Sequence, residues 1–414
     1  MLHKILQSLF TKGSIAVINL LILITTSKFL GISTRGEISI LILNLAIIQM
    51  VNEIYTGYSL VHFTSRYNIS KIYANGFIFT ILINSISNLV LYFTGGLPDD
   101  FHLLFFILSF MIILNTFNCV LILSRELFKI YNLLSILQPL LLLTGILYFT
   151  FIRNDYTMNA FLWPLVISFG AAFTLSTYVV FRFVLSQNSG NDFEWKPIIK
   201  NGLFCQMAVL MYILSGRLNY YLLESKPDVG LYSTASSLIE SVLIITNAVT
   251  PILLSRVAII GKNTQSIRLT LVFAKACLIF SLLAIALLYM IPNNWFTFIL
   301  GKSFSANKDL MLLLSPGIVF LSFSGIISHY FSGIGNLKMV SFYNFFGFST
   351  TAILAPFLIK SYGIHGAAIT TNISYFITFL VSVLVFLKST QTPLHALFSI
   401  KSDLQELKTI IASK

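Results

Sequence analysis

The sequence predicts an all-α polytopic membrane protein, with twelve transmembrane helices in two six-helix lobes around a central cavity. Of its 414 residues, 57% are hydrophobic and only 10% are charged, whereas soluble domains carry roughly 25% charged residues. Apolar runs of about 20 residues recur between short polar breaks, and a helix of that length crosses a hydrocarbon core of about 30 Å. Similar turns follow the first and seventh runs, which indicates that the second half repeats the first.

The N-terminal lobe, residues 1–185, begins with basic residues followed by an apolar run. This is the outline of a signal peptide, but no small-residue cleavage site follows and the apolar run is too long. We therefore expect the run to stay as the first helix. The six helices of this lobe are expected at residues 8–30, 38–62, 76–97, 101–123, 132–152 and 159–183.

A cytoplasmic linker, residues 186–200, is expected to join this lobe to the C-terminal lobe, residues 201–387. Residues 388–414 form a tail whose apolar residues recur at the spacing of one helical face, so we expect a cytoplasmic amphipathic helix on the inner membrane surface. The six helices of the C-terminal lobe are expected at residues 201–223, 229–254, 269–291, 310–333, 338–359 and 364–387.

Two pairs of junctions indicate the internal duplication. LGISTRGEISI follows the first helix and SKPDVGLYSTA follows the seventh, and Gly36 and Gly230 open the next helix in both places. SRELFKIYN follows the fourth helix and GIGNLKMVSFYN follows the tenth. Six helices followed by six in the same orientation is the simplest account, and shared turn chemistry is the alternative.

The charge distribution predicts the topology. An even number of helices places both termini on one side, and most of the 26 lysines and arginines fall on that side. Basic residues gather in cytoplasmic loops, so both termini are expected in the cytoplasm. The same rule explains the net charge of +12 without nucleic acid as a partner. The three cysteines all fall inside apolar runs and are expected to be small core residues.

Five prolines fall inside expected helices, where each removes a backbone donor and bends the axis. A moving transporter can use such bends, although proline is also ordinary in membrane helices. They are Pro139, Pro164, Pro251, Pro316 and Pro356.

Three ionisable residues lie well inside expected helices: Glu53, Arg217 and Glu240. Each would be costly against lipid, so all three are expected to face a cavity or one another. Arg217 either reaches the membrane surface, forms a fixed ion pair with Glu53 or Glu240, or binds an anionic group of a substrate. Glu53 and Glu240 are either structural carboxyl groups or proton-coupling groups.

Amide side chains are concentrated in helices 1, 2, 7 and 8, which indicates a polar lumen between the halves. The commoner role of a single amide in a membrane helix is to bond a neighbouring helix. A tyrosine near the lumen can offer its ring to a sugar, although tyrosine near a helix end is more often an interfacial residue. The expected substrate-binding residues are Arg217, Asn219, Tyr212, Asn19 and Asn52.

Four basic residues at the expected cytoplasmic mouth are candidates for attracting a phosphate group from the inner leaflet. The tendency of basic residues to lie in the cytoplasm also accounts for them. They are Lys12, Arg66, Arg256 and Lys275.

No enzyme motif stands out. The sequence has no G-x-x-x-x-G-K-[ST] phosphate loop and no H-E-x-x-H metal motif, and its 6 histidines are scattered. We therefore expect no catalytic residues, no metal site and no cofactor.

Three segments resemble a known family: GSIAVINLLILITTSKFLGISTRGEISI, DVGLYSTASSL and YGIHGAAITTNISYFI. They are similar to the Wzx-type O-antigen and polysaccharide flippases of bacteria. These belong to the multidrug/oligosaccharidyl-lipid/polysaccharide exporter superfamily, which includes the MATE transporters. The resemblance extends over nearly the whole chain in helix count and loop length, and its motifs are mostly glycines and tyrosines at turns.

The resemblance implies alternating access and an undecaprenyl-pyrophosphate-linked oligosaccharide that moves from the inner to the outer leaflet of the bacterial inner membrane. It implies membrane lipid, a polysaccharide polymerase and chain-length proteins as partners, and it leaves proton or sodium coupling open. Flippases of this type have a cationic lumen, which Arg217 matches. The sequence departs from that pattern because it offers one deep arginine rather than several, together with two glutamates.

Two other functions stay open. A cation-coupled drug exporter of the MATE type should favour an acidic, aromatic lumen over Arg217. A membrane-embedded oligosaccharide polymerase or ligase typically carries a large external loop with arginines, whereas the outer loops here are short.

Overall fold

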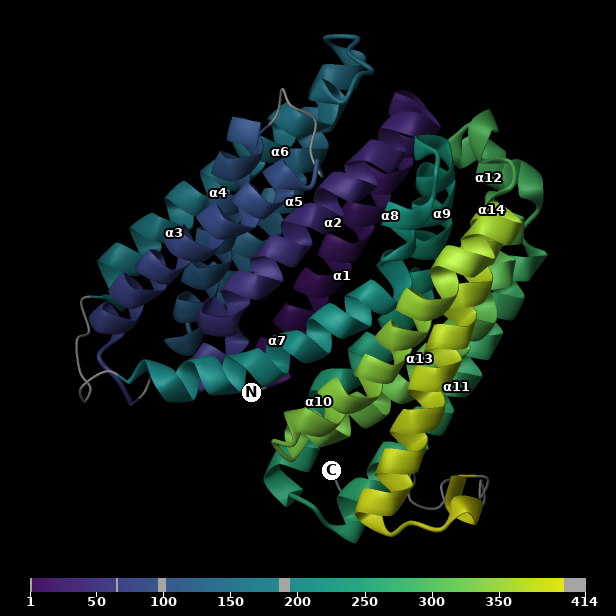
Figure 1. Ribbon diagram of the computed structural model, residues 1–414. Helices are drawn as coiled ribbons and strands as arrows, with labels where there is room; N and C mark the ends of the chain where they lie inside the picture. The colour runs from purple at the N-terminus through teal and green to yellow at the C-terminus, as the bar shows by residue number, and fades with distance from the viewer. Residues whose placement is uncertain (1, 65, 96–101, 186–193, 398–414) are drawn as a thin grey trace. The chain divides into compact units, whose positions relative to one another are not determined.

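The computed structural model describes residues 2–64, 66–95, 102–185 and 194–397, and most of them are helical (Figure 1). The chain divides into two compact units. Unit 1 comprises Met1–Leu210 with Ile299–Ser303, and unit 2 comprises Met211–Phe298 with Phe304–Lys414. The division falls inside a helix downstream of the expected linker at residues 186–200, of which residues 186–193 lie outside the described part of the chain.

Up to Leu210, the described residues of unit 1 form six long helices, two short π-helical turns, a 3-10 turn and the start of a seventh helix. Asn68 caps the third long helix, because its side chain accepts from the backbone N–H groups of Ser70 and Lys71. The elements are α1 (Leu2–Thr25), η1 (Thr26–Leu30), α2 (Gly31–Thr56), η2 (Tyr58–His62), α3 (Ile69–Phe93), α4 (His102–Ser124), α5 (Phe128–Phe151), α6 (Asn159–Val179), η4 (Val180–Val184) and α7 (Trp195–Arg217).

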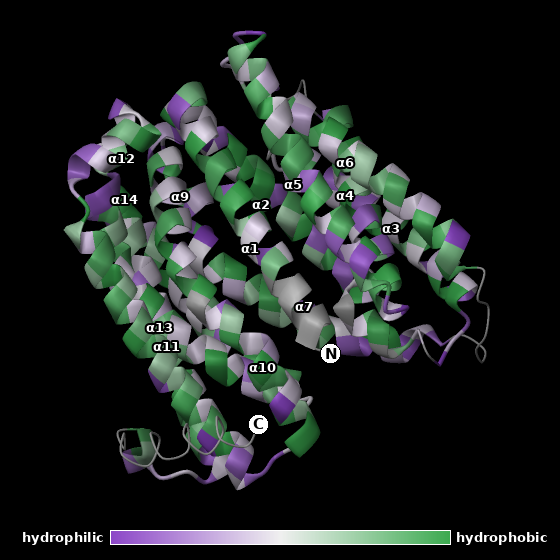
Figure 2. Cartoon of the chain, turned by 180° about the vertical axis from the view of Figure 1, so that it is seen from behind, coloured by the Kyte–Doolittle hydropathy of each residue, from purple (hydrophilic) through white to green (hydrophobic). Residues whose placement is uncertain are grey.

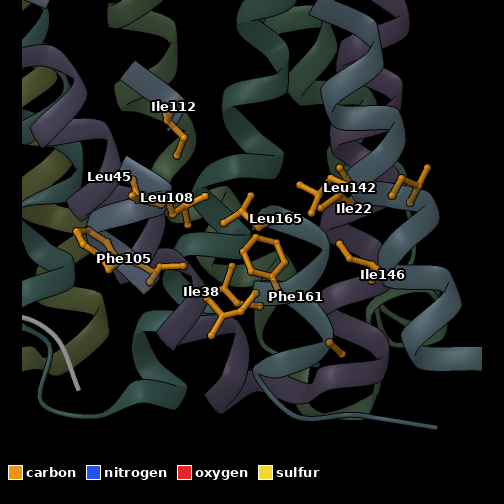
Figure 3. Close-up of a cluster of buried hydrophobic side chains, with 14 of the residues drawn as sticks. Ile22, Ile38, Leu45, Phe105, Leu108, Ile112, Leu142, Ile146, Phe161 and Leu165 are labelled. Atoms are coloured by element: carbon orange, nitrogen blue, oxygen red, sulfur yellow. The ribbon is translucent and has the colours of Figure 1, made fainter. Parts of the chain in front are cut away.

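The core of unit 1 is built from branched aliphatic and phenylalanine side chains that meet where the long helices pack. α5 packs against α1 and α6, and α4 packs against α2, α3 and α6. Ile38, Ile146 and Phe161 are among the fully buried members of one such cluster (Figure 3). Apolar side chains on the outer helix faces, such as Ile78 and Leu89 on α3, are exposed instead. A helix that is apolar on both faces suits a bilayer, where lipid covers the outer face.

Unit 2 is organised around one central helix, α13 (Asn307–Gly333), which packs against α9, α10, α11 and α14. The first element of the unit is the end of α7, from Met211 onward. The elements that follow along the chain are α8 (Asn219–Leu222), α9 (Lys226–Glu240), η5 (Ser241–Leu243), α10 (Ile244–Ile260), α11 (Thr264–Met290), α12 (Asn293–Leu300), η6 (Lys302–Phe304), α14 (Leu337–Thr390) and η7 (Leu394–Leu397). Of these, the end of α12 and the start of η6, within Ile299–Ser303, belong to unit 1.

The long element α14 consists of two spans. A straight helix of its 54 residues would extend about 81 Å, far beyond a hydrocarbon core of about 30 Å. Gly363 interrupts it with φ 54° and ψ −132°, a backbone conformation that glycine adopts readily. The Ser374 hydroxyl donates to the Gly347 carbonyl at 2.7 Å, and a Cβ on Gly366 would overlap the Leu358 carbonyl. The two halves therefore lie side by side and antiparallel. They correspond to the helices expected at 338–359 and 364–387.

The first expected pair of helices also forms one long run. Phe10–Val61 is apolar over 52 residues, and Gly31, at φ 85°, separates α1 and η1 from the rest of α2. Among the described residues, nine helices are long and apolar enough to cross a membrane, or ten if the pair Lys226–Leu243 and Thr246–Ile260, bent by 47°, is one span. Counting each long run as two spans gives the expected twelve.

Two expected helices are discontinuous. The helix expected at 229–254 is divided into α9 and α10 by the short 3-10 turn η5, directly after Glu240. The helix expected at 201–223 is α7 followed, after Leu218, by the single turn of α8. Hydrophobic residues predominate along the long helices (Figure 2). Polar residues lie at both breaks, Glu240 and Ser241 at the first and Arg217 and Asn219 at the second, but such residues do not by themselves end a membrane helix. All five prolines lie inside helices, as expected.

Candidate substrate and coupling sites

The arginine at the end of α7 is paired within unit 2. Arg217 is the last residue of that helix, and its Nη2 lies 3.2 Å from Oε2 of Glu240, the last residue of α9. A cation in the last turn of a helix is stabilised by the helix dipole. The side chains of Arg217 and Glu240 are 32% and 24% exposed. Both side chains are therefore partly buried, and part of each stays accessible.

The second oxygen of the Glu240 carboxylate accepts a hydrogen bond from a hydroxyl group. Ser236 lies one helical turn before Glu240 on α9, and its Oγ donates to Glu240 Oε1 at 3.0 Å. Each carboxylate oxygen thus has one donor, Arg217 or Ser236. A guanidinium carries five N–H donors, and the bond to Glu240 uses one nitrogen of Arg217. The remaining donors give Arg217 the capacity to bind an anion while Glu240 stays in place.

Aromatic side chains surround this pair. Tyr212 lies on α7 and is 38% exposed. Its hydroxyl group interacts electrostatically with both Arg217 and Glu240. The Tyr375 hydroxyl from α14 lies against Gly216, at a place where any side chain on Gly216 would overlap it. The absence of a side chain at Gly216 therefore lets Tyr375 approach the end of α7.

Asn219, two residues after Arg217, occupies a different environment. It is fully buried, and its Nδ2 donates to Thr371 Oγ1 at 2.8 Å and to the Ala367 carbonyl at 3.1 Å. Its Nδ2 is also 3.2 Å from the hydroxyl of Tyr232, which in turn lies 2.6 Å from Thr371 Oγ1. These bonds join α8, α9 and α14, as amides commonly do in membrane helices. Contact between Asn219 and a substrate stays a prediction.

The other predicted substrate-binding residues belong to unit 1. Asn52 is fully buried, and its side chain donates to the carbonyl of Ile48 in its own helix at 3.0 Å. Asn19 is exposed on α1. The structure therefore brings Tyr212 and Arg217 together in unit 2 and places Asn19 and Asn52 in unit 1.

Glu53 lies between two glutamine side chains of unit 1. Its Oε1 accepts from Gln49 Nε2 at 2.7 Å, and its Oε2 accepts from Gln206 Nε2 at 3.2 Å. Gln206 reaches it because α7 and α2 approach closely at Gly202, where a Cβ would overlap the carbonyl of Ile54. Glycine at this position thus permits the contact between residues 153 positions apart in the chain.

A polar cavity of about 280 Å³ borders Glu53 inside unit 1. It lies among α2, α4, α5 and α6, and most of its lining side chains are amides, hydroxyls or aromatic rings. These residues are Gln49, Glu53, Asn115, Thr116, Cys119, Tyr131, Leu134, Ser135, Gln138 and Phe169. Sequence reasoning about helices 1, 2, 7 and 8 missed Asn115 and Gln138. The available signal was helical spacing, since Tyr131, Ser135 and Gln138 recur at i, i+4 and i+7.

The four basic residues proposed for the cytoplasmic mouth do not share one environment. Lys12, Arg66 and Arg256 are exposed. Lys275 on α11 is partly buried, and its Nζ donates to the carbonyl of Ala396 in η7 at 2.8 Å. Lys275 thus connects the chain after α14 to α11. Of the expected tail at 388–414, residues 398–414 lie outside the described part of the chain.

Within the described residues, no group of three or more His, Cys, Asp or Glu side chains is arranged to hold a metal ion. The three cysteines are free thiols; Cys277 is buried, and Cys119 and Cys205 are partly buried.

The fold defines a class: a multi-pass membrane protein whose architecture is shared with MATE-like transporters and flippases. The solved structures it matches include the lipid II flippase MurJ in an inward closed conformation, with a TM-score of 0.70 and 15% identity over 100% of this chain and 93% of that chain. They also include a mutant of the MATE transporter VcmN of Vibrio cholerae, with a TM-score of 0.65 and 15% identity over 96% and 98% of the two chains.

A third match is an inward-facing multidrug resistance transporter of the MATE family and MOP superfamily, with a TM-score of 0.67 and 16% identity over 91% and 94% of the two chains. No protein-family model matches the chain, and no curated protein matches it. At these identities the likeness concerns the fold, and the fold is the one that the resemblance implied.

Proposed function

We propose that the chain is a flippase that moves a polyprenyl-pyrophosphate-linked oligosaccharide from the inner to the outer leaflet of the bacterial inner membrane by alternating access, with both termini in the cytoplasm. The observation that carries the proposal is Arg217: a guanidinium at the end of an apolar helix, still 32% exposed although it is paired with Glu240. An arginine that served only as a structural partner would have less reason to stay accessible in a membrane.

The physical task agrees with these residues. A pyrophosphate head group cannot cross hydrocarbon unaided, so the protein must supply a polar path while the prenyl tail stays in lipid. In the proposal Arg217 binds the pyrophosphate or an acidic sugar, and Tyr212 offers a ring face beside it. Lys12, Arg66 and Arg256 attract the head group from the inner leaflet. The fold that the chain shares with the lipid II flippase MurJ supports a lipid-linked substrate. A polysaccharide polymerase and chain-length proteins would use the product.

Coupling is assigned to Glu53, with Glu240 as a second candidate. Glu53 is partly buried and borders a polar cavity, so a proton or sodium ion that enters this cavity can reach its carboxylate. Binding and release of a proton or sodium ion at Glu53 would change which conformation of the protein is favoured. Any ligand that binds one conformation more tightly than the other has this effect. In this proposal the chain catalyses no chemical reaction and is not an enzyme.

The second candidate function is a cation-coupled drug exporter of the MATE type. Two carboxylates inside helices and the tyrosines beside Glu240 favour it, as do the matches to VcmN and to the multidrug resistance transporter. The accessible guanidinium of Arg217 opposes it, because it would repel cationic drugs.

The test is complementation of a strain from which the chromosomal copy is deleted. Arg217→Ala, expressed at the wild-type level, should fail to restore surface polysaccharide, whereas Arg217→Lys should restore part of it because the positive charge is kept. Full restoration by Arg217→Ala would rule out the binding role. Loss of drug resistance with intact polysaccharide on deletion of the gene would favour the exporter.

A further inference from the structure

Three side chains near the end of α7 carry hydrogen-bond donors that the protein leaves unused. The bond to Glu240 occupies one nitrogen of Arg217, whereas a guanidinium has five N–H donors. The hydroxyls of Tyr212 on α7 and Tyr375 on α14 donate no hydrogen bond within the described part of the chain. Both tyrosines interact electrostatically with Arg217 and Glu240, so the unused donors of all three side chains share one neighbourhood of unit 2.

Two glycines hold the ring of Tyr375 in place. Tyr375 is only 5% exposed. Its hydroxyl lies against Gly216, where a Cβ would overlap it, and its ring lies against Gly317 of α13, where a Cβ would come within 3.0 Å of Cδ2. The ring therefore has little freedom to turn away from the end of α7. A donor that is already fixed loses less entropy when a ligand binds.

The Tyr375 hydroxyl lacks a partner without being enclosed. The Tyr330 hydroxyl is fully buried and finds no partner, whereas the Tyr375 oxygen keeps accessible surface. A donor that is shielded from water and left without an acceptor costs free energy, so native structures usually supply one. The two oxygens of Glu240 accept from Arg217 and Ser236 rather than from either tyrosine. The unused hydroxyls therefore indicate an acceptor that comes from outside the chain.

The donors match a diphosphate better than a carboxylate. Phosphate oxygens accept short, strong hydrogen bonds from guanidinium and hydroxyl groups. A diphosphate has more acceptor oxygens than a carboxylate, so it can accept from Arg217 and from both hydroxyls together. The hydroxyls add donors without adding charge, so Arg217 and Glu240 still balance each other when no anion is bound.

We propose that Tyr375 and Tyr212 donate their hydroxyl hydrogens to the non-bridging oxygens of a diphosphate group that Arg217 binds. The two hydroxyls thereby determine which anion the site takes. The inference rests on the proposed function and deepens it, because it selects the diphosphate over the acidic sugar as the group that Arg217 binds.

Titration calorimetry of the purified full-length protein in detergent tests the proposal. The probes are inorganic pyrophosphate and glucuronate, at an ionic strength kept constant with sodium chloride. Pyrophosphate should bind saturably and more tightly than glucuronate. Tyr375→Phe keeps the ring and removes the hydroxyl, so it should weaken pyrophosphate binding by about tenfold or more, as expected for a hydrogen bond to a charged group. Tyr212→Phe should have a similar effect.

The matched control is Tyr343→Phe on the same helix. The Tyr343 hydroxyl donates to Ser328 Oγ at 2.6 Å, so its loss should lower the melting temperature and leave pyrophosphate affinity unchanged. Tyr375→Phe should do the opposite: affinity falls, and the melting temperature is kept because the hydroxyl has no protein partner. A residue with a purely structural role would not separate affinity from stability in this way.

Geranyl pyrophosphate distinguishes a lipid-linked diphosphate from a free one. In the same detergent it should bind at least as tightly as inorganic pyrophosphate, and Tyr375→Phe should weaken it as well. Binding of inorganic pyrophosphate alone would overturn the assignment to a lipid-linked group.

Three further results would overturn the proposal: no saturable binding of pyrophosphate by the wild type, unchanged affinity in Tyr375→Phe, or an equal loss of affinity in Tyr343→Phe. Complementation with Arg217→Ala tests the proposed function separately. If Tyr375→Phe binds like the wild type while Arg217→Ala abolishes surface polysaccharide, the tyrosine site fails and the flippase stands. If Tyr375→Phe loses affinity while Arg217→Ala is active, the reverse holds.

Discussion

The side-chain amide of Asn372 pairs with both ends of one backbone turn of α13: its Oδ1 accepts from the Gly317 N–H at 2.8 Å, and its Nδ2 donates to the Leu313 carbonyl at 2.6 Å. In an unbroken helix these two backbone groups pair with each other. Pro316 stands next to Gly317 and has no N–H for the carbonyl of Leu312. The Ser315 hydroxyl donates to that carbonyl at 2.7 Å instead.

Side chains thus satisfy the backbone where the proline interrupts the central helix of unit 2. Helix breaks in membranes persist when neighbouring helices and hydroxyl groups satisfy the freed backbone groups. Asn372 comes from α14, so the interruption in α13 is stabilised by the helix that packs against it. The turn around Pro316 is a defined place where α13 can bend.

Replacing Asn372 by leucine should destabilise unit 2. Both backbone groups lose their side-chain partner, and each buried group left unsatisfied costs about 1 to 3 kcal/mol. Thermal unfolding in detergent measures the loss. Asn75→Leu is a suitable control, because the Asn75 side chain is exposed and bonds its own helix. An unchanged melting temperature for Asn372→Leu would show that the bridge does not stabilise the fold.

A double-mutant cycle on Arg217 and Glu240 separates the two roles of the arginine. Arg217→Leu and Glu240→Leu should each lower stability, because each leaves a partly buried charge unpaired. Breaking a fully buried ion pair costs about 3 to 5 kcal/mol. The cost should be smaller here, because both side chains are partly exposed. The double variant should recover stability.

Transport distinguishes the outcomes of that cycle. If Arg217 binds the substrate anion, the double variant folds well and still restores no surface polysaccharide. A double variant that recovers both stability and transport would mean that the arginine is present only to neutralise Glu240.

Glu53→Gln should abolish the response of transport to an imposed pH gradient in proteoliposomes, because an amide cannot carry the proton. Gln49 and Gln206 can still bond the new side chain, so the fold should be kept. Glu224→Gln, a change at an exposed position, is the control and should respond like the wild type. Wild-type transport that ignores the gradient, in sodium-free buffer and with sodium present, would exclude Glu53 as a proton-coupling group.

Gly202→Val should separate α7 from α2. The added side chain would overlap the carbonyl of Ile54, and forced overpacking costs about 1 to 3 kcal/mol. The variant should lose stability and, because Gln206 moves away from Glu53, should also show altered coupling. Gly13→Ala is the control, since no atom lies within 4 Å of a Cβ at Gly13. Equal melting temperatures for the two variants would contradict the close packing.

The membrane-spanning architecture follows from the sequence. The length of an apolar run is a one-dimensional property that the hydrocarbon thickness selects, so the spans can be read in order along the chain, including the pair that meets at Gly363. The prolines and the three charges inside helices are equally visible. The breaks at η5 and after Leu218 are not: polar residues lie beside them, Glu240 and Ser241 at the first and Arg217 and Asn219 at the second, but such residues do not by themselves end a helix, and the interruption lies in backbone geometry.

The partners of those residues were decided by the tertiary structure. Sequence reasoning named Glu53 and Glu240 as alternatives for Arg217, and the structure brings the last residue of α7 against the last residue of α9, so that Arg217 pairs with Glu240 at 3.2 Å. The contact of Gln206 with Glu53 depends on a glycine that lets two backbones approach. The cavity residues Asn115 and Gln138 come from α4, which has no Asp, Glu, Lys or Arg, and from α5, whose one such residue, Lys129, lies in its first turn. Hydrophobicity determines which segments enter the membrane, whereas which side chains meet there depends on how closely, and in which orientation, the helices pack.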